Sequence, residues 1–131
     1  MDELPIRSGD DVVRVRQQVR NTAAENGLSL VDQTKLVTAA SELARNTLVH
    51  GGGGTALVEV VKSPNGRAGV KLRFTDEGPG IADIGLALTD GWSSGTGLGL
   101  GLSGSRRLVD EFELSSQPGA GTSVVVVKWS R

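Results

Sequence analysis

The stretch SELARNTLVHGGGG, residues 41–54, joins two segments of different periodicity, and this change decides the fold. Up to His50, apolar residues recur every three or four positions, which predicts a helix over residues 31–50. The next residues, TALVEVVK, follow a period of two, as a half-buried strand does. The four glycines between them end the helix, because glycine readily adopts backbone conformations that a helix excludes. We therefore expect a helix that leads directly into a sheet.

Patterns on both sides of this stretch predict further elements. Upstream, residues 10–26 form an amphipathic helix, with Asp10 as its N-cap and Gly27 as its end. Downstream, VKLRFTD follows TALVEVVK after the turn SPNGRAG, and the two runs predict a β-hairpin with one buried face. EFELSSQ and TSVVVVKW flank PGAG and predict a second hairpin. A short helix over 82–89 and a helix over 100–111 complete the chain.

The order of these elements predicts an α+β fold. It fits a two-layer α/β sandwich, with helices on one face of a mixed, mostly antiparallel sheet. Residues 124–127, all valine, are apolar on both faces of their strand, which predicts a central strand covered by helices. A chain of 131 residues is expected to form one domain, residues 1–131.

Composition excludes several classes of function. The formal net charge is −1, so there is no electrostatic basis for binding nucleic acid or an anionic membrane. The absence of cysteine excludes disulfides, thiolate metal sites and cysteine nucleophiles. No apolar run is long enough to span a membrane, and the acidic start MDELPIRSGDD has no signal-peptide core. We expect a soluble cytoplasmic protein with no nucleic-acid or membrane partner.

Two polar residues on the helix over 31–50 suit catalytic chemistry. Glu42 and Asn46 are four residues apart, so they lie on the same side of the helix, at the edge of its apolar stripe. The amide oxygen of Asn46 is a suitable ligand for a hard cation such as Mg²⁺. The carboxylate of Glu42 is a suitable general base for an attacking hydroxyl. Taken alone, the pair is better explained as an ordinary solvated helix face.

A second group of candidate residues follows a predicted strand, in TDEGPGI, residues 75–81. Asp76 stands at the end of the strand, and its carboxylate can accept a hydrogen bond from a donor such as the exocyclic amine of adenine. Gly78 and Gly80 allow the backbone to turn tightly against a ligand. Thr122 begins the last strand, and its hydroxyl can face a base. Turn and hairpin chemistry is the alternative for each of these residues.

The glycine-rich loop TGLGLGLSGSRRL, residues 96–108, is the third candidate. Gly97, Gly99 and Gly101 can turn backbone N–H groups toward phosphate oxygens. The run GLGLSG matches a dinucleotide-binding fingerprint, but no strand precedes it and no room remains for a doubly wound sheet. A phosphate-binding loop is therefore favoured over a nicotinamide site. The arginine pair that follows is expected to carry surface charge.

Together, these motifs resemble the GHKL superfamily of ATPases and kinases. Their order is E-x-x-x-N on a helix, D-x-G-x-G after a strand, G-x-G-x-G in a loop and G-T before the last strand. The resemblance spans residues 36–129. The length leaves no room for the additional domains of Hsp90, gyrase or MutL, or for a phosphoacceptor-histidine helix. The chain is most similar to the compact anti-sigma-type serine/threonine kinases, and among them to the stressosome switch kinases.

The resemblance implies an ATP site with Mg²⁺ as a second cofactor. It implies that Glu42 activates the attacking hydroxyl, that Asn46 ligates Mg²⁺ at the ATP phosphates, and that Asp76 recognises adenine. Thr122 would support the adenine contact through water, and residues 83–97 would form a lid. The implied ATP-binding residues are Asn46, Asp76, Gly78, Gly80, Gly97, Leu98, Gly99, Leu100, Gly101 and Thr122.

The resemblance also implies partners. The expected substrate is a serine or threonine of a STAS-domain protein in a bacterial stress pathway. The kinase is also expected to activate a PP2C-type phosphatase, by binding it or its N-terminal domain. Two alternatives stay open: an anti-sigma factor that binds a sigma factor directly, and a module that binds ATP without transferring phosphate. Glu42 and Asn46 together argue against the second, because a binding module needs no general base.

Overall fold

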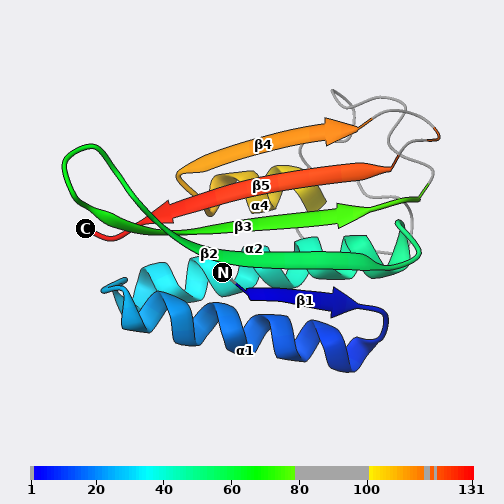
Figure 1. The fold of residues 1–131 in the computed structure, drawn as a ribbon, viewed down its shortest axis with the longest axis horizontal. Coiled ribbons are helices and arrows are strands. Elements are labelled where there is room, and N and C mark those ends of the chain that lie inside the picture. Colours follow the sequence, from blue (N-terminus) through cyan, green and yellow to red (C-terminus); the bar gives the residue numbers. More distant parts are fainter. Residues whose placement is uncertain (1, 79–100, 117–118, 120) are drawn as a thin grey trace.

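The computed structural model describes residues 2–78, 101–116, 119 and 121–131. Figure 1 shows its elements, which are β1 (Asp2–Ile6), α1 (Gly9–Glu25), α2 (Leu30–Val49), β2 (Gly54–Lys62), β3 (Ala68–Asp76), α4 (Gly101–Arg107), β4 (Glu111–Ser116) and β5 (Thr122–Trp129). The helix expected over 82–89 lies outside the described residues. No helix in the described ranges is long and apolar enough to cross a membrane.

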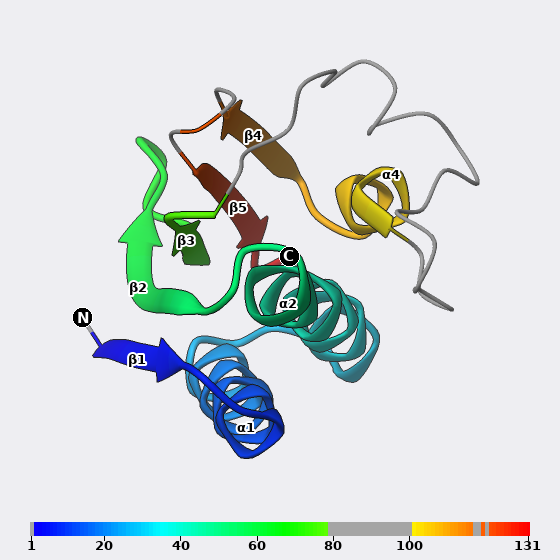
Figure 2. The same ribbon diagram turned by 90° about the vertical axis from the view of Figure 1, so that its right-hand side faces the viewer.

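The strands form one sheet in the order β1-β2-β3-β5-β4. The four neighbouring pairs are all antiparallel, where a mixed, mostly antiparallel sheet was expected. Figure 2 shows α1, α2 and α4 together on one face of this sheet, the inner face. The predicted two-layer α+β sandwich is thus confirmed, with an antiparallel sheet as its strand layer.

Alternate residues of the strands face the helices and form the core. Along β3, Val70, Leu72 and Phe74 are buried, while Lys71 and Arg73 between them are not. Buried leucines of α2 belong to the same apolar cluster. Burial of a leucine or phenylalanine side chain contributes about 1.5–3 kcal/mol. This packing therefore fixes α2 against the sheet along most of its length.

The N-terminal strand β1 was not expected from the sequence. Its five residues, DELPI, include a proline, which within sheets is typical of edge strands. β1 lies at the edge and pairs only with β2, placing Leu4 opposite Ala56. Ile6 is fully buried. The segment becomes a strand because β2 offers it a partner, which its own short pattern does not reveal.

Helix α1 begins slightly earlier than expected, with Ser8 as its N-cap rather than Asp10. The next acidic residue, Asp11, accepts a hydrogen bond from the backbone N–H of Arg7 at 2.8 Å. This bond lowers the pKa of the Asp11 carboxyl below its usual value. The end of the helix agrees with the prediction, because Gly27 follows it with a positive φ of 82°.

Helix α4 is shorter than the helix expected over 100–111. It ends at Arg107, and the backbone N–H of Leu108 donates to the carbonyl of Ser105, which forms a tighter last turn. Pairing with β5 then draws the chain from Glu111 onward into β4. The side chains of Arg106 and Arg107 are exposed, as expected of surface charges.

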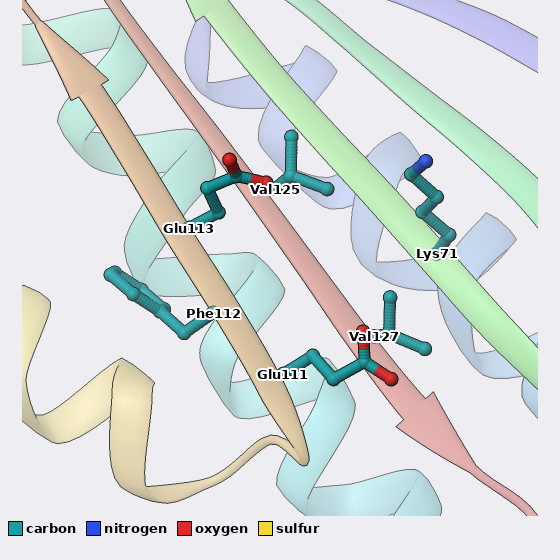
Figure 3. A pocket seen from close by; sticks show the side chains of 6 residues that line it. All are labelled: Lys71, Glu111, Phe112, Glu113, Val125 and Val127. Atoms are coloured by element: carbon teal, nitrogen blue, oxygen red, sulfur yellow. The ribbon is translucent and has the colours of Figure 1, made fainter.

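The valines at 124–127 lie alternately on the two faces of β5, and the described helices cover one of these faces. Val124 and Val126 lie in the core, with 5% and 0% of their surface exposed. Val125 and Val127 lie on the opposite, outer face (Figure 3). The predicted sandwich, with helices on one face of the sheet, accounts for this arrangement, and β5 lies inside the sheet between β3 and β4. Val127 is nevertheless only 7% exposed, because the side chains of neighbouring strands shield it.

Charged residues meet in the core layer near the end of β5. Lys128 is 4% exposed, and its Nζ atom lies 3.6 Å from carboxylate oxygens of both Asp32 and Asp110. Arg131 pairs with the same two carboxylates, at 3.5 and 2.7 Å. These contacts tie the first turn of α2 to the C-terminal end of β5 and to the residue before β4.

Candidate functional site

The last turns of α2 carry Glu42 and Asn46. Both side chains are half-buried, beside the buried Leu43 and Ala44, so they lie at the edge of the apolar stripe as the sequence predicted. The buried hydroxyl of Thr47, between them and the end of the helix, is satisfied within α2, because it donates to the carbonyl of Leu43 at 2.9 Å. Because α2 is packed against the sheet, the two polar residues have fixed positions relative to it.

The glycines after α2 close the helix and turn the chain into β2. The backbone N–H groups of His50 and Gly51 both donate to the carbonyl of Asn46, at 2.9 and 3.1 Å. Gly52 and Gly53 then adopt positive φ angles of 74° and 108°. Side chains with a Cβ atom rarely accept such angles. The glycine run therefore ends the helix as predicted.

Gly51 has a second role, which the sequence did not reveal. A Cβ atom on it would lie 2.3 Å from Cγ and 2.6 Å from Oδ2 of Asp76, the last residue of β3. A Cβ atom on Gly78 would in turn lie 2.7 Å from the Cα atom of Gly51. Only residues without side chains allow this approach. The contact brings the end of α2 and the end of β3 together.

Asp76 lies in a transverse row of residues on the inner face of the sheet. In the strand register it is opposite Gly54 on β2 and Thr122 on β5, and Thr122 is opposite Ser116 on β4. One carboxylate oxygen of Asp76 accepts from the backbone N–H of Gly78 at 2.8 Å. The predicted residues Asp76, Gly78 and Thr122 thus come together at one end of the sheet, next to α2.

Ser116 is a member of this row that the sequence did not indicate. Its hydroxyl donates to the carbonyl of Gly121 at 3.0 Å and lies 3.0 Å from the hydroxyl oxygen of Thr122. With the single Ser116 proton given to Gly121, Thr122 is the donor in the second contact. The Thr122 oxygen is then an acceptor toward a ligand, as is the carboxylate of Asp76. Only strand pairing could reveal Ser116, since its position in SSQ carries no motif.

Of the remaining predicted residues, some lie within the described ranges and others do not. Gly101 begins α4, which packs against α2. The predicted residues at 80 and 97–100, and all of the predicted lid over 83–97, lie outside the described residues. Glu42 lies one helical turn before Asn46, farther from Asp76 along α2.

The chemistry of Asn46 fits a single contact to a hard cation. Among the described residues, its side-chain amide makes no hydrogen bond, so the amide oxygen is available as a ligand for Mg²⁺. In the same ranges, no group of three or more acidic or histidine side chains gathers that could hold a metal ion. A cation at Asn46 would therefore take most of its ligands from phosphate oxygens and water, which is how Mg²⁺ is commonly held with nucleotides.

Residues 31–130 match the family of histidine kinase-, DNA gyrase B-, and HSP90-like ATPases. The chain belongs to this family. It is 46% identical, over 121 residues, to Serine/threonine-protein kinase RsbT of Bacillus subtilis (strain 168), an alignment that covers 92% of this chain and 90% of that relative. The family and this relative show that the chain is an ATP-binding serine/threonine protein kinase of the GHKL type.

More distant relatives include the Anti-sigma F factors of Thermoanaerobacter sp. (strain X514) and Thermoanaerobacter pseudethanolicus (strain ATCC 33223 / 39E). Each is 27% identical over 117 residues, which covers 87% of this chain and 82% of the relative. Both the kinase branch and the anti-sigma branch, which the sequence motifs indicated, thus occur among these relatives. The identity to the kinase is the higher of the two.

Solved structures show the same fold. The RsbU and RsbW domains of Rv1364c from Mycobacterium tuberculosis match with a TM-score of 0.64 and 23% identity, covering all of this chain and 33% of that one. This chain therefore spans about a third of that protein. The mycobacterial sensor histidine kinase MprB matches with a TM-score of 0.57 and 21% identity, covering 99% of both chains. At these identities the likeness concerns the fold alone.

Proposed function

We propose that this chain, as a single domain over residues 1–131, is a switch kinase of a bacterial partner-switching stress pathway. It transfers the γ-phosphate of ATP to a serine or threonine hydroxyl of a STAS-domain regulator. The observation that carries the proposal is the placement of Glu42 and Asn46 on α2, whose end meets Asp76 through Gly51. The 46% identity to a serine/threonine kinase supports the same reaction.

The adenine end of the nucleotide lies at the transverse row. Asp76 accepts a hydrogen bond from the exocyclic amine of adenine, and Thr122 supports this contact through a water molecule. Both groups are hydrogen-bond acceptors, so they match the amine of adenine. They repel the carbonyl oxygen that guanine has at the same position, because that oxygen is also an acceptor. The close contacts of Gly51 and Gly78 leave no side chain at this wall of the site.

The phosphate end lies along α2 and the glycine-rich segment. Asn46 contributes its amide oxygen to Mg²⁺, which when bound neutralises charge on the phosphates. Backbone N–H groups supplied by Gly97, Leu98, Gly99, Leu100 and Gly101 wrap the phosphate oxygens, as the resemblance implies, and Gly80 lets the backbone after Asp76 turn tightly against the nucleotide. Phosphoryl transfer depends mainly on positioning and on charge neutralisation, so this small set of groups suffices.

Glu42 is the general base in this proposal. Its carboxylate accepts the proton of the substrate hydroxyl as the hydroxyl oxygen attacks the γ-phosphorus. The bond from that phosphorus to the β,γ-bridging oxygen breaks, and ADP leaves with the electron pair. Glu42 is half-buried and makes no hydrogen bond to a side chain in the described ranges, so its carboxylate is available for this step.

The test is transfer of radiolabelled phosphate from ATP to a purified STAS-domain protein. We expect transfer by the wild type and a decrease of about 10²–10⁴-fold in the Glu42→Gln variant, with ATP affinity retained. Glu25→Gln, an exposed change at the end of α1, is the matched control and should leave transfer unchanged. No transfer by the wild type would overturn the proposal, and undiminished transfer by Glu42→Gln would overturn the role of Glu42.

A second candidate function is that of an anti-sigma factor, which the two 27% identical relatives favour. Calorimetric titration of the chain with a PP2C-type phosphatase, its isolated N-terminal domain and a sigma factor separates the alternatives. A switch kinase binds the phosphatase or its N-terminal domain and not the sigma factor. Tight binding of the sigma factor alone would favour the second function.

A further inference from the structure

Gly121, the residue before β5, lies against the end of β3. Figure 1 shows the end of β3 and the start of β5 at the same end of the sheet. Gly121 is buried and has a positive φ of 84°. A Cβ atom on it would lie 2.2 Å from the carbonyl oxygen of Asp76 and 3.0 Å from the Cα atom of Glu77. Both are backbone atoms, which cannot swing aside as a flexible side chain can, so only glycine fits at this contact.

Asp76 is therefore confined by glycines from two different turns. Gly51, after α2, lies against its side chain, where an added Cβ atom would be 2.3 Å from Cγ. Gly121 lies against its backbone carbonyl. The first contact limits where the carboxylate can lie. The second limits the position of the backbone from which that carboxylate extends.

Gly121 also acts on the hydroxyl of Thr122, by way of Ser116. The Gly121 carbonyl accepts from the Ser116 hydroxyl at 3.0 Å, and the Ser116 oxygen lies 3.0 Å from the Thr122 hydroxyl oxygen. Because the Ser116 proton points at Gly121, the Ser116 oxygen accepts from Thr122. Gly121 thus contacts the backbone of one proposed adenine ligand and determines the hydrogen-bond direction at the other.

We propose that Gly121 is a positioning residue for recognition of the base, and that it sets the preference of the site for adenine over guanine. The inference rests on the proposed function, in which Asp76 and Thr122 are the acceptors at the adenine amine. Gly121 itself does not touch the nucleotide. A shift at Gly121 displaces the Asp76 carboxylate and the Thr122 hydroxyl together, so both acceptors lose their alignment with the amine at once.

Gly119, in the same turn, provides a matched control. Its φ is 79°, close to that of Gly121, but a Cβ atom on it would meet nothing within 4 Å. Alanine at either position has the strain of a positive φ. Only alanine at position 121 also presses on the backbone of Asp76. The difference between the two variants therefore separates the contact from the strain.

The test compares the Kd values for ATP and GTP, measured by isothermal titration calorimetry below the thermal transition of each variant. We expect the wild type and Gly119→Ala to bind ATP equally and to prefer it to GTP. Gly121→Ala should bind ATP about 10–100-fold more weakly, as expected when a hydrogen bond to a charged group is lost. Its Kd for GTP should change much less, whereas a partly unfolded protein would lose affinity for both nucleotides equally.

Two further variants test the route of the effect. Once Asp76→Asn has removed the charged acceptor, adding Gly121→Ala should weaken ATP binding by only a small further factor, because residues that act through one contact are not additive. Ser116→Ala leaves Gly121 in place and should narrow the preference for ATP by a smaller factor than Gly121→Ala. This smaller change keeps the test decisive even if Gly121→Ala does not fold.

The outcomes distinguish this inference from the proposed function. Equal ATP affinities of Gly119→Ala and Gly121→Ala, an equal loss for ATP and GTP, or an unchanged preference in Ser116→Ala would each overturn the inference alone. Losses that multiply in the double variant with Asp76→Asn would show that Gly121 does not act through Asp76. A wild type that binds ATP and GTP equally would instead overturn the adenine contacts of the proposed function.

Discussion

The two ends of helix α2 are constructed in opposite ways. At its first turn, Asp32 meets the buried Lys128, and Asp110 and Arg131 complete a set of paired charges. At its last turn, the neighbouring groups are the glycines at 51–54 and the row that contains Asp76. There, one oxygen of Asp76 accepts from Gly78, and the other has no hydrogen-bond donor among the described residues.

This difference separates stability from binding along one helix. Charges that are buried and paired with one another stabilise the fold only as long as every partner is present. Half-buried acceptors with remaining hydrogen-bonding capacity contribute little to the fold but can bind a ligand. Substitutions at the first turn should therefore change the free energy of unfolding, and substitutions at the last turn should change nucleotide affinity.

The largest expected effect is at the first turn of α2. Lys128→Met leaves the partly buried carboxylates of Asp32 and Asp110 with the exposed Arg131 as their one remaining cation in the described residues, which costs about 3 kcal/mol in the free energy of unfolding. Urea denaturation measures this loss, and ATP affinity should stay unchanged below the transition. Lys62→Met, at an exposed position, is the control. Normal stability combined with weakened ATP binding would contradict the separation.

The next effect is at the last turn. Asp76→Asn removes the charged acceptor for the adenine amine, so the Kd for ATP should rise about 10–100-fold, while the free energy of unfolding changes little. Isothermal titration calorimetry measures the Kd. Glu77→Gln changes the neighbouring exposed carboxylate and should leave it unaltered. An unchanged Kd for ATP in the Asp76→Asn variant would refute the adenine contact.

A third test concerns the contact between α2 and β3. Gly51→Ala adds a Cβ atom 2.3 Å from Cγ of Asp76, which forces the carboxylate to move and costs about 1–3 kcal/mol. ATP affinity should fall as the acceptor is displaced. Gly9→Ala is the matched control, because a Cβ atom there meets nothing within 4 Å. Equal ATP affinity in both variants would show that Gly51 only ends the helix.

The smallest effect is expected at Ser116. Ser116→Ala removes the hydroxyl that holds the Thr122 hydroxyl as an acceptor, at a cost of about 1 kcal/mol. Thr122 can then also donate, so the preference for ATP over GTP should narrow. Comparison of the two Kd values measures this preference, with Ser115→Ala on the outer face as the control. An unchanged preference would leave Ser116 a purely structural role.

Local patterns in the sequence predicted much of this molecule. The helix over 31–50 and both hairpins follow from residue periodicity, and the structure confirms them. Glu42 and Asn46 are placed by the geometry of one helix, which depends only on their spacing. The family was also recognisable, because its motifs occur in a fixed order along the chain.

Contacts between distant segments were not predictable in this way. The strand β1 exists because β2 offers it an edge, and Ser116 matters because strand pairing sets it beside Thr122. The position of Lys128, four residues after Val124 in an apolar run, gave no sign that Asp32 lies next to it. Each of these contacts joins residues whose separation along the chain carries no local signal.

The sequence by itself determined the two long helices, both hairpins, the family and the residues whose chemistry suits phosphoryl transfer, because each depends on residue type and short spacing. The tertiary structure decided which ends of these elements meet. It set Gly51 against Asp76, and Thr122 beside Ser116. Strand order and register are properties of the whole sheet, so no single segment of sequence encodes them.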